Sequence, residues 1–171
     1  MTPVRRQRKA FQASLRAGLA ALIVGVGLAW PGARAAVAAT TERIITDRHT
    51  GLAIDGYDPV AYFTEGAATP GLPDFEHRFS GVVWRFRNEG DLAAFIQDPD
   101  IYMPAFGGYD PIAISRGVAV SGNPTVWLVA GDRLFLFYSL EDRAAFAADP
   151  EHALAEAEAR WPEVSGKLVQ R

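Results

Sequence analysis

The chain has 171 residues, of which 49% are hydrophobic and 22% are charged, so its composition is that of one globular domain or two small ones. Because it contains no cysteine, disulfides, thiolate metal sites and cysteine nucleophiles are excluded. Residues 1–35 hold six basic residues and no acidic ones, which leaves 11 basic and 20 acidic residues, a net charge of −9, for residues 36–171. This acidic part is a poor partner for nucleic acid, because lysine and arginine supply most of the affinity for phosphate.

The first 38 residues have the pattern of a secretory signal peptide. A basic start is followed by the apolar run AGLAALIVGVGLAW and then by small residues with two A-x-A exits, at Ala33–Ala35 and Ala36–Ala38. The run is shorter than the ~20 residues of a membrane-spanning helix. We expect a signal peptide over 1–38, by the Sec or the twin-arginine route, a periplasmic or secreted protein, and no stable membrane insertion once the signal is removed. An uncleaved anchor is the alternative.

A short lead-in over 39–49 precedes two related segments. Residues 56–62 read GYDPVAY and residues 108–114 read GYDPIAI, an offset of 52. Residues 84–100, WRFRNEGDLAAFIQDPD, match residues 135–151, FLFYSLEDRAAFAADPE, at an offset of 51. Two blocks in the same order and nearly the same register predict an internal duplication.

The predicted domain covers 50–162 and consists of two units, about 50–104 and 105–161, with a tail over 163–171. In each unit an Asp-Pro pair opens a short helix, over 58–64 and 110–115, because aspartate caps helices and proline fits the first turn.

Residues of alternating polarity then predict a hairpin in each unit. Its turn falls at Ser80-Gly81 in the first unit and over 130–133 in the second. A helix follows each hairpin, capped by Asn88 and by Ser139. The last helix, EHALAEAEAR, is expected to end at Trp161-Pro162. The fold class is therefore α+β, with internally duplicated hairpin–helix units that form one antiparallel-sheet domain with helices packed on it.

The segments AIDGYDPVAYFTEG, WRF and AAFIQDPDIYMPAFGGY, with the final hairpin, resemble the YHS domain family in its secreted, single-domain members. The resemblance covers residues 50–162. It implies a binding module that takes a metal ion, because YHS domains accompany metal-transport proteins. Secreted members commonly read GGY-Cys, whereas this chain has Asp110 after Tyr109. The change removes the soft ligand that favours copper or zinc.

The duplicated turns supply the candidate ligand-binding residues, which are Tyr57, Asp58, Tyr62, Tyr109 and Asp110. If the two units pack symmetrically, their carboxylates and phenols converge and suit a hard cation or a small polar molecule. Helix capping is the alternative for the aspartates, because Asp-Pro occurs four times, at 58, 98, 110 and 149, each where a helix is expected to start. Asp58, Asp110 and His77 are the candidate metal ligands, and a metal ion is the candidate cofactor.

No catalytic signature is present: the chain has no G-x-S-x-G motif, and its three histidines, at 49, 77 and 152, are far apart in sequence. The sequence therefore favours an exported, non-catalytic binding module for a metal ion or small polar ligand. The alternative is a structural or interaction accessory protein of the periplasm, which meets a protein partner and holds no ligand.

Overall fold

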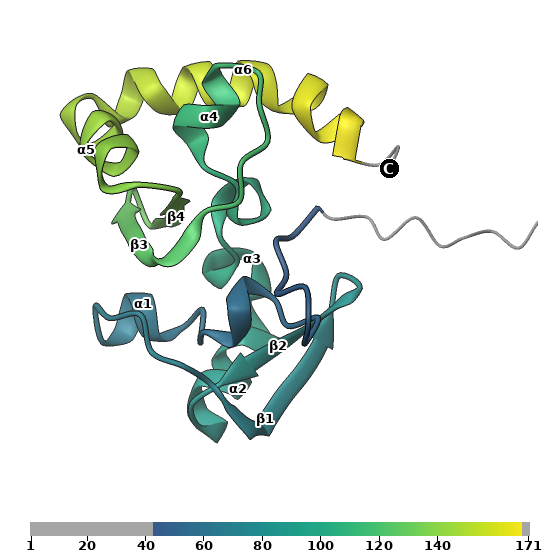
Figure 1. The fold of residues 1–171 in the computed structure, drawn as a ribbon. Helices are drawn as coiled ribbons and strands as arrows, with labels where there is room; N and C mark the ends of the chain where they lie inside the picture. The colour runs from purple at the N-terminus through teal and green to yellow at the C-terminus, as the bar shows by residue number, and fades with distance from the viewer. Residues whose placement is uncertain (1–42, 169–171) are drawn as a thin grey trace, which may run out of the picture. The chain divides into compact units, whose positions relative to one another are not determined.

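The computed structural model describes residues 43–168, so the predicted signal peptide lies outside the described residues. In chain order the elements are the 3-10 turn η1 (Ile54–Gly56), α1 (Ala61–Thr64), β1 (Leu72–Phe79), β2 (Val82–Phe86), α2 (Glu89–Gln97), α3 (Pro99–Tyr102), the 3-10 turn η2 (Ala105–Gly108), α4 (Pro111–Ser115), β3 (Asn123–Ala130), β4 (Arg133–Phe137), α5 (Leu140–Ala148) and α6 (Pro150–Leu168). Figure 1 shows these elements along the chain. We call residues 50–104 the first half and residues 105–168 the second half.

The fold is α+β, as predicted, but the described strands form two separate two-stranded antiparallel sheets rather than one. The expected single sheet is wrong because the outer side of β2 is occupied. Ala53 donates its amide to the carbonyl of Val83 at 2.8 Å, and Leu52 forms a bridge with the same residue. In the second half, η2 lies against β4. In the first half an irregular segment thus takes the place beside β2 where a further strand would have to join.

The two hairpins have the same irregularity. β1 pairs with β2, and the register shifts between Leu72 and Glu76. β3 pairs with β4, and the register shifts between Asn123 and Trp127, at the position 51 residues later. Both turns lie where the sequence predicts them, because Phe79 pairs with Val82 and Ala130 with Arg133. Extra residues on one strand bend a hairpin, so both hairpins bend at the same point.

Each hairpin packs against the helix that follows it. The ring of Phe95 on α2 lies 5.1 Å from those of Trp84 and Phe86, measured between centroids. The ring of Phe146 on α5 lies 4.7 Å from Phe135 and 5.4 Å from Phe137. All six rings are at most 1% exposed. Burial of each such ring contributes about 2–3 kcal/mol, so these two aromatic clusters supply much of the core.

The helix caps predicted from the sequence are confirmed. The side chain of Asn88 accepts a hydrogen bond from the amide of Asp91 at 2.9 Å, and Ser139 accepts one from the amide of Asp142 at 3.1 Å. A side-chain oxygen at this position satisfies an amide that has no partner within the helix.

The predicted end of the last helix at Trp161-Pro162 is wrong, because α6 continues through Pro162 to Leu168. A proline inside a helix removes one backbone hydrogen bond. Burial on both sides of it offsets that loss, since Ala157 is fully buried and Val164 is 2% exposed. α6 packs along α4 (Figure 1). Tertiary packing therefore overrides the local preference, and residues 163–168 of the predicted tail are helical.

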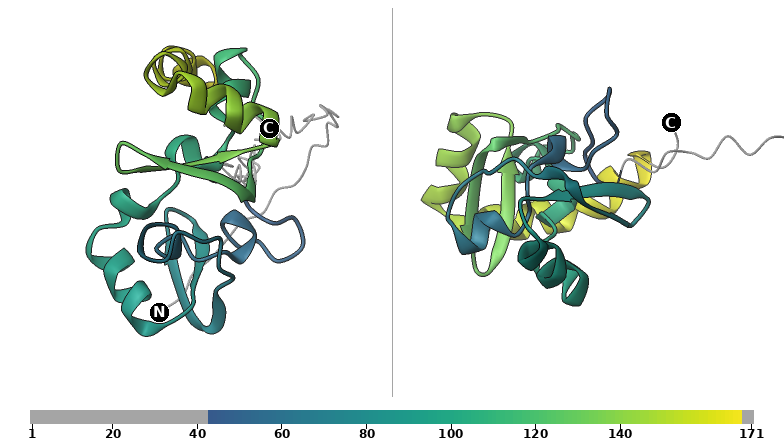
Figure 2. Two further views of the ribbon diagram at one scale, coloured as in Figure 1. Left: turned by 90° about the vertical axis from the view of Figure 1, so that its left-hand side faces the viewer. Right: turned by 90° about the horizontal axis from the view of Figure 1, so that it is seen from below.

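The two halves share one core. The hydroxyl of Tyr62 donates a hydrogen bond to the carbonyl of Pro124 at 2.9 Å, and its ring meets Trp127 edge-on at 5.2 Å. The β3–β4 hairpin lies between α6 and the first half (Figure 2). Within residues 43–168 no helix is both long and apolar enough to cross a membrane.

Candidate functional site

Asp58 and Asp110 are both fully buried, and each carboxylate accepts three backbone hydrogen bonds. One oxygen of Asp58 accepts from the amides of Val60 and Ala61 at 2.8 and 3.4 Å, and the other accepts from Arg87 at 2.7 Å. Val60 directly precedes α1 and Ala61 is its first residue, whereas Arg87 directly follows β2. The carboxylate therefore ties the Tyr-Asp-Pro turn to the end of the hairpin.

Asp110 makes the same set of contacts in the second half. One oxygen accepts from the amides of Ile112 and Ala113 at 2.8 and 3.3 Å, and the other accepts from Tyr138 at 2.8 Å. Tyr138 directly follows β4, as Arg87 follows β2. Asp110 is the N-cap of α4, as the capping interpretation predicts, whereas Asp58 lies two residues before Val60, the N-cap of α1. Each carboxylate also anchors the end of a strand.

The backbone around the two turns repeats as well. The amide of Asp58 donates to the carbonyl of Thr69 at 2.8 Å, and that of Asp110 donates to Val120 at 2.9 Å. Gly71 and Gly122 adjoin these segments. A side chain at either glycine would lie 2.6 Å from the following hairpin. Only glycine allows so close an approach.

Burial changes the acidity of both aspartates. It raises the pKa of Asp58 to about 6, and the amides of Arg87 and Val60 oppose this only in part. Burial also raises the pKa of Asp110. Removal from water disfavours the charged form of a carboxyl group. These groups therefore titrate at higher pH than an exposed aspartate.

The three candidate tyrosines lie in different surroundings. Tyr57 is partly buried and forms a bridge with Pro70. Tyr62 is buried, and this burial raises the pKa of its phenol. Tyr109 is 5% exposed and packs near the ring of Trp161, at 6.1 Å. The ligand-binding role of the tyrosines and of the two aspartates stays a prediction.

His77 lies on β1 opposite Trp84 and is partly buried. Within the part of the chain that the structure describes, no group of three or more His, Asp or Glu side chains is placed to hold a metal ion. Both oxygens of Asp58 and of Asp110 already accept amide hydrogens. Three of the roughly four lone-pair positions of each carboxylate are thus used by the fold itself.

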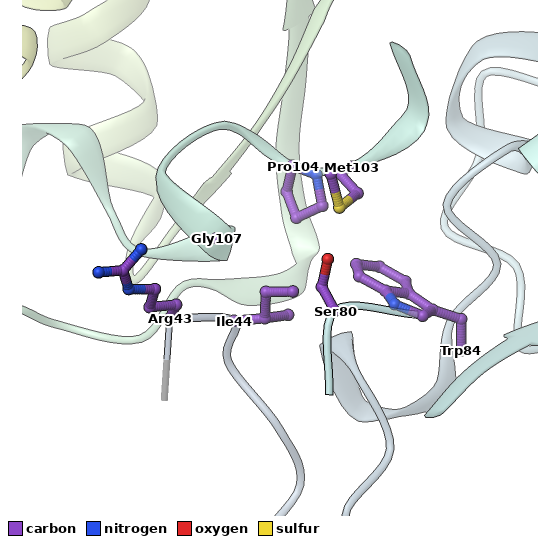
Figure 3. A pocket seen from close by; sticks show the side chains of 7 residues that line it. All are labelled: Arg43, Ile44, Ser80, Trp84, Met103, Pro104 and Gly107. Atoms are coloured by element: carbon purple, nitrogen blue, oxygen red, sulfur yellow. The ribbon is translucent and has the colours of Figure 1, made fainter. Parts of the chain in front are cut away.

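A pocket of about 230 Å³, which we call the first pocket, lies between the lead-in, the first hairpin and η2. None of the five candidate ligand-binding residues lines it. Its lining consists of Arg43, Ile44, Ser80, Trp84, Met103, Pro104 and Gly107. Figure 3 shows the hydroxyl of Ser80 directed into the hollow, while the guanidinium of Arg43 lies at its edge, on the side of Gly107. The walls are mostly apolar and include the fully buried Trp84.

Gly107 shapes this pocket by allowing the lead-in to approach. A side chain at Gly107 would lie 1.6 Å from the carbonyl oxygen of Arg43, and its φ of +65° is in the left-handed region. The carbonyl of Gly107 accepts a hydrogen bond from the amide of Ile45 at 2.8 Å. Ile44 and Ile45 are 8% and 5% exposed. The end of the lead-in, over 43–49, is thus part of the domain. The Gly107-Gly108 pair is the sequence signal that points to a close approach here.

A second pocket, of about 480 Å³, lies between the turn of the β3–β4 hairpin and the junction of α5 with α6. Phe135, Phe146 and Leu154 give it apolar walls, and Asp149 and Glu151 lie on its rim. Three lining positions of the two pockets correspond at the offset of 51. Ser80 corresponds to Gly131, Trp84 to Phe135 and Met103 to Leu154. The same part of each half is therefore hollow, with different side chains.

No family model, curated protein or solved structure matches this chain.

Proposed function

We propose that this chain is an exported, non-catalytic binding module of the YHS type, built from two copies of one unit, and that the first pocket binds its ligand. The ligand is a small ring compound that carries one hydrogen-bond acceptor. The observation that carries the proposal is a mostly apolar hollow into which one hydroxyl, that of Ser80, points (Figure 3).

The repeated contacts support an origin by duplication. The three hydrogen bonds to each aspartate, the hairpin registers and the aromatic packing all recur at an offset of 51 or 52 residues. Resemblance of GYDPVAYF to the YHS family supports the class of protein. The N-terminal pattern supports export, and intact-mass measurement of the exported protein should show loss of about 35–38 residues.

The chemistry of the pocket lining supports the choice of ligand. Apolar walls bind a ring, and a few polar groups at defined positions orient it. Ser80 has no hydrogen-bond partner for its hydroxyl among the described residues, so this group is free to donate. Arg43 is exposed at the edge, and its long side chain favours an anionic acceptor. The volume is somewhat below the roughly 300–1,000 Å³ of drug-sized sites, which favours a single ring.

Benzoate is a suitable probe, and calorimetric titration of the purified protein tests the proposal. We expect saturable binding that weakens about fivefold in Ser80→Ala and in Arg43→Gln, as expected for loss of ~1 kcal/mol of polar interaction. Ser80→Phe should abolish binding, because it fills the hollow from an exposed turn. Arg48→Gln is the matched control, since Arg48 is an exposed arginine of the same lead-in and does not line the pocket. Equal binding by all four variants and the original protein would contradict the proposal.

A second candidate is the interaction protein without a ligand. It is favoured by two large apolar side chains that remain exposed two positions apart in sequence, Tyr138 at 65% and Leu140 at 64%. Scattered exposed apolar residues are common, so this observation is weaker. Native mass spectrometry of the protein from its own source distinguishes the two. A retained small molecule supports the binding module, and a retained protein subunit supports the interaction protein.

A further inference from the structure

The second pocket differs from the first in its charge. Asp149 and Glu151 are exposed on its rim, at the beginning of α6. One oxygen of Asp149 accepts a hydrogen bond from the amide of His152 at 3.2 Å, so this residue also caps the helix. Within residues 43–168 neither carboxylate has a cationic partner.

Each of the other acidic residues of α6 has a basic side chain within 4 Å, which sets these two apart. Glu156 lies 3.5 Å from His152, Glu158 lies 2.8 Å from Arg133, and Glu163 lies 2.8 Å from Lys167. Arg133 is the nearest cation on the hairpin, 5.5 Å from the centre of the Phe135 ring, and it is held by Glu158. The rim of the pocket therefore carries uncompensated negative charge.

The interior of the pocket is apolar. Phe135 and Phe146 form its floor, and the partly buried side chain of Leu154 contributes a wall. Gly131 has no atom within 4 Å of the place where a side chain would begin, so the hairpin turn leaves the entrance free. An aliphatic or aromatic body fits these walls, and the rim favours a positive charge at its end.

We propose that the second pocket binds an organic cation, a single ammonium group on a hydrocarbon body. The ammonium group lies between Asp149 and Glu151, and the hydrocarbon lies over Phe135 and Leu154. The macrodipole of α6 is positive at this end and weakens the attraction, so the apolar contact is needed as well as the charge. This site goes beyond the proposed function, because it shares no residue with the first pocket.

Phenethylammonium is the probe, and 2-phenylethanol and 3-phenylpropionate are its neutral and anionic counterparts. Calorimetric titration should show saturable binding of the cation, at least tenfold weaker binding of the alcohol, and no binding of the anion. Raising the salt concentration from 20 to 500 mM should weaken binding of the cation severalfold, because rim charges are screened. Equal binding of cation and alcohol would overturn the proposal, as would absence of saturable binding of the cation.

Substitutions of the lining residues test whether phenethylammonium binds in the second pocket. Asp149→Asn keeps a capping oxygen but removes the charge, and Asp149→Asn combined with Glu151→Gln should weaken binding of the cation at least tenfold. Ala148→Trp should block the pocket from an exposed helix position. Glu141→Gln is the matched control, because Glu141 is an exposed, unpaired acid in the first turn of α5. Unchanged binding in the double variant would overturn the proposal. Arg43→Gln, which tests the first pocket, should leave binding of phenethylammonium unchanged.

Discussion

The first and second halves have nearly the same framework but different pockets. In both, a buried aspartate joins the Tyr-Asp-Pro turn to the end of a hairpin, through hydrogen bonds of 2.7 and 2.8 Å. The lead-in adjoins the hollow of the first half and gives it Arg43 and Ile44. The start of α6 adjoins the hollow of the second half and gives it Asp149 and Glu151. The framework is thus set by polar and glycine contacts within each half, and the pocket chemistry by the segment that packs beside it.

The largest expected effect comes from the buried aspartates. Asp58→Ala and Asp110→Ala each leave three amides without their acceptor. We expect each to lower the free energy of unfolding by about 4 kcal/mol, because unsatisfied buried polar groups are costly. Urea denaturation measures the free energy of unfolding of both variants. A loss below ~1 kcal/mol in either variant would show that the two turns are not equivalent anchors.

Gly107→Ala should have the next largest effect, about 3 to 4 kcal/mol, because the new methyl group displaces the lead-in and exposes Ile44 and Ile45. Gly117→Ala is the matched control. Its φ of +81° is also left-handed, but no atom lies within 4 Å, so only the backbone strain of about 1 kcal/mol remains. Thermal denaturation of both variants separates the cost of displacing the lead-in from the cost of backbone strain. Equal losses would contradict the docking of the lead-in at Gly107.

Stability should also depend on pH through Asp58. Because burial raises its pKa to about 6, above the ordinary value of about 3.9, the folded state holds this proton more tightly than the unfolded state. The contribution of Asp58 to the free energy of unfolding therefore falls by up to about 3 kcal/mol as pH rises from 4 to 6.5. Urea denaturation across this range should show a smaller fall in Asp58→Asn. Identical pH profiles for the two proteins would rule out the raised pKa.

The smallest expected loss of stability comes from removing the helix caps, one in each half. Asn88→Ala and Ser139→Ala remove matched capping oxygens from α2 and α5. Each should cost about 1 kcal/mol, which is typical of a helix cap. Urea denaturation of the two variants measures the loss, and no loss in one of them would show that its cap is redundant.

Local features of this fold could be predicted from the sequence, and long-range ones could not. The helix caps and the hairpin turns depend on contacts between residues close in sequence, so a sequence pattern predicts them. The caps are Asn88 and Ser139. The place of Ile45 against Gly107 joins segments far apart in the chain. The continuation of α6 through Pro162 also depends on a long-range contact, because α6 packs against α4.

In the candidate site, too, contacts between residues far apart in sequence could not be predicted. The sequence predicted helix starts at Asp58 and Asp110. Asp110 is the N-cap of α4, whereas the helix after Asp58 begins three residues later, at Ala61. The sequence did not indicate that each carboxylate also accepts the amide after a distant strand, at Arg87 or Tyr138. The pockets were not foreseen, because each is built from separated segments. The walls of the first pocket come from the lead-in, the first hairpin and residues 103–107, and those of the second pocket come from a hairpin and a helix junction.

Titration of ¹⁵N-labelled protein with each probe, followed by amide chemical shifts, tests the central claim most directly. That claim is that one framework carries two hollows of different charge preference. Benzoate should shift the amides of Ile44, Ser80 and Gly107, whereas phenethylammonium should shift those of Gly131, Ala148 and Leu154. Shifts of one common set of amides by both probes, or no saturable shifts with either, would contradict the account.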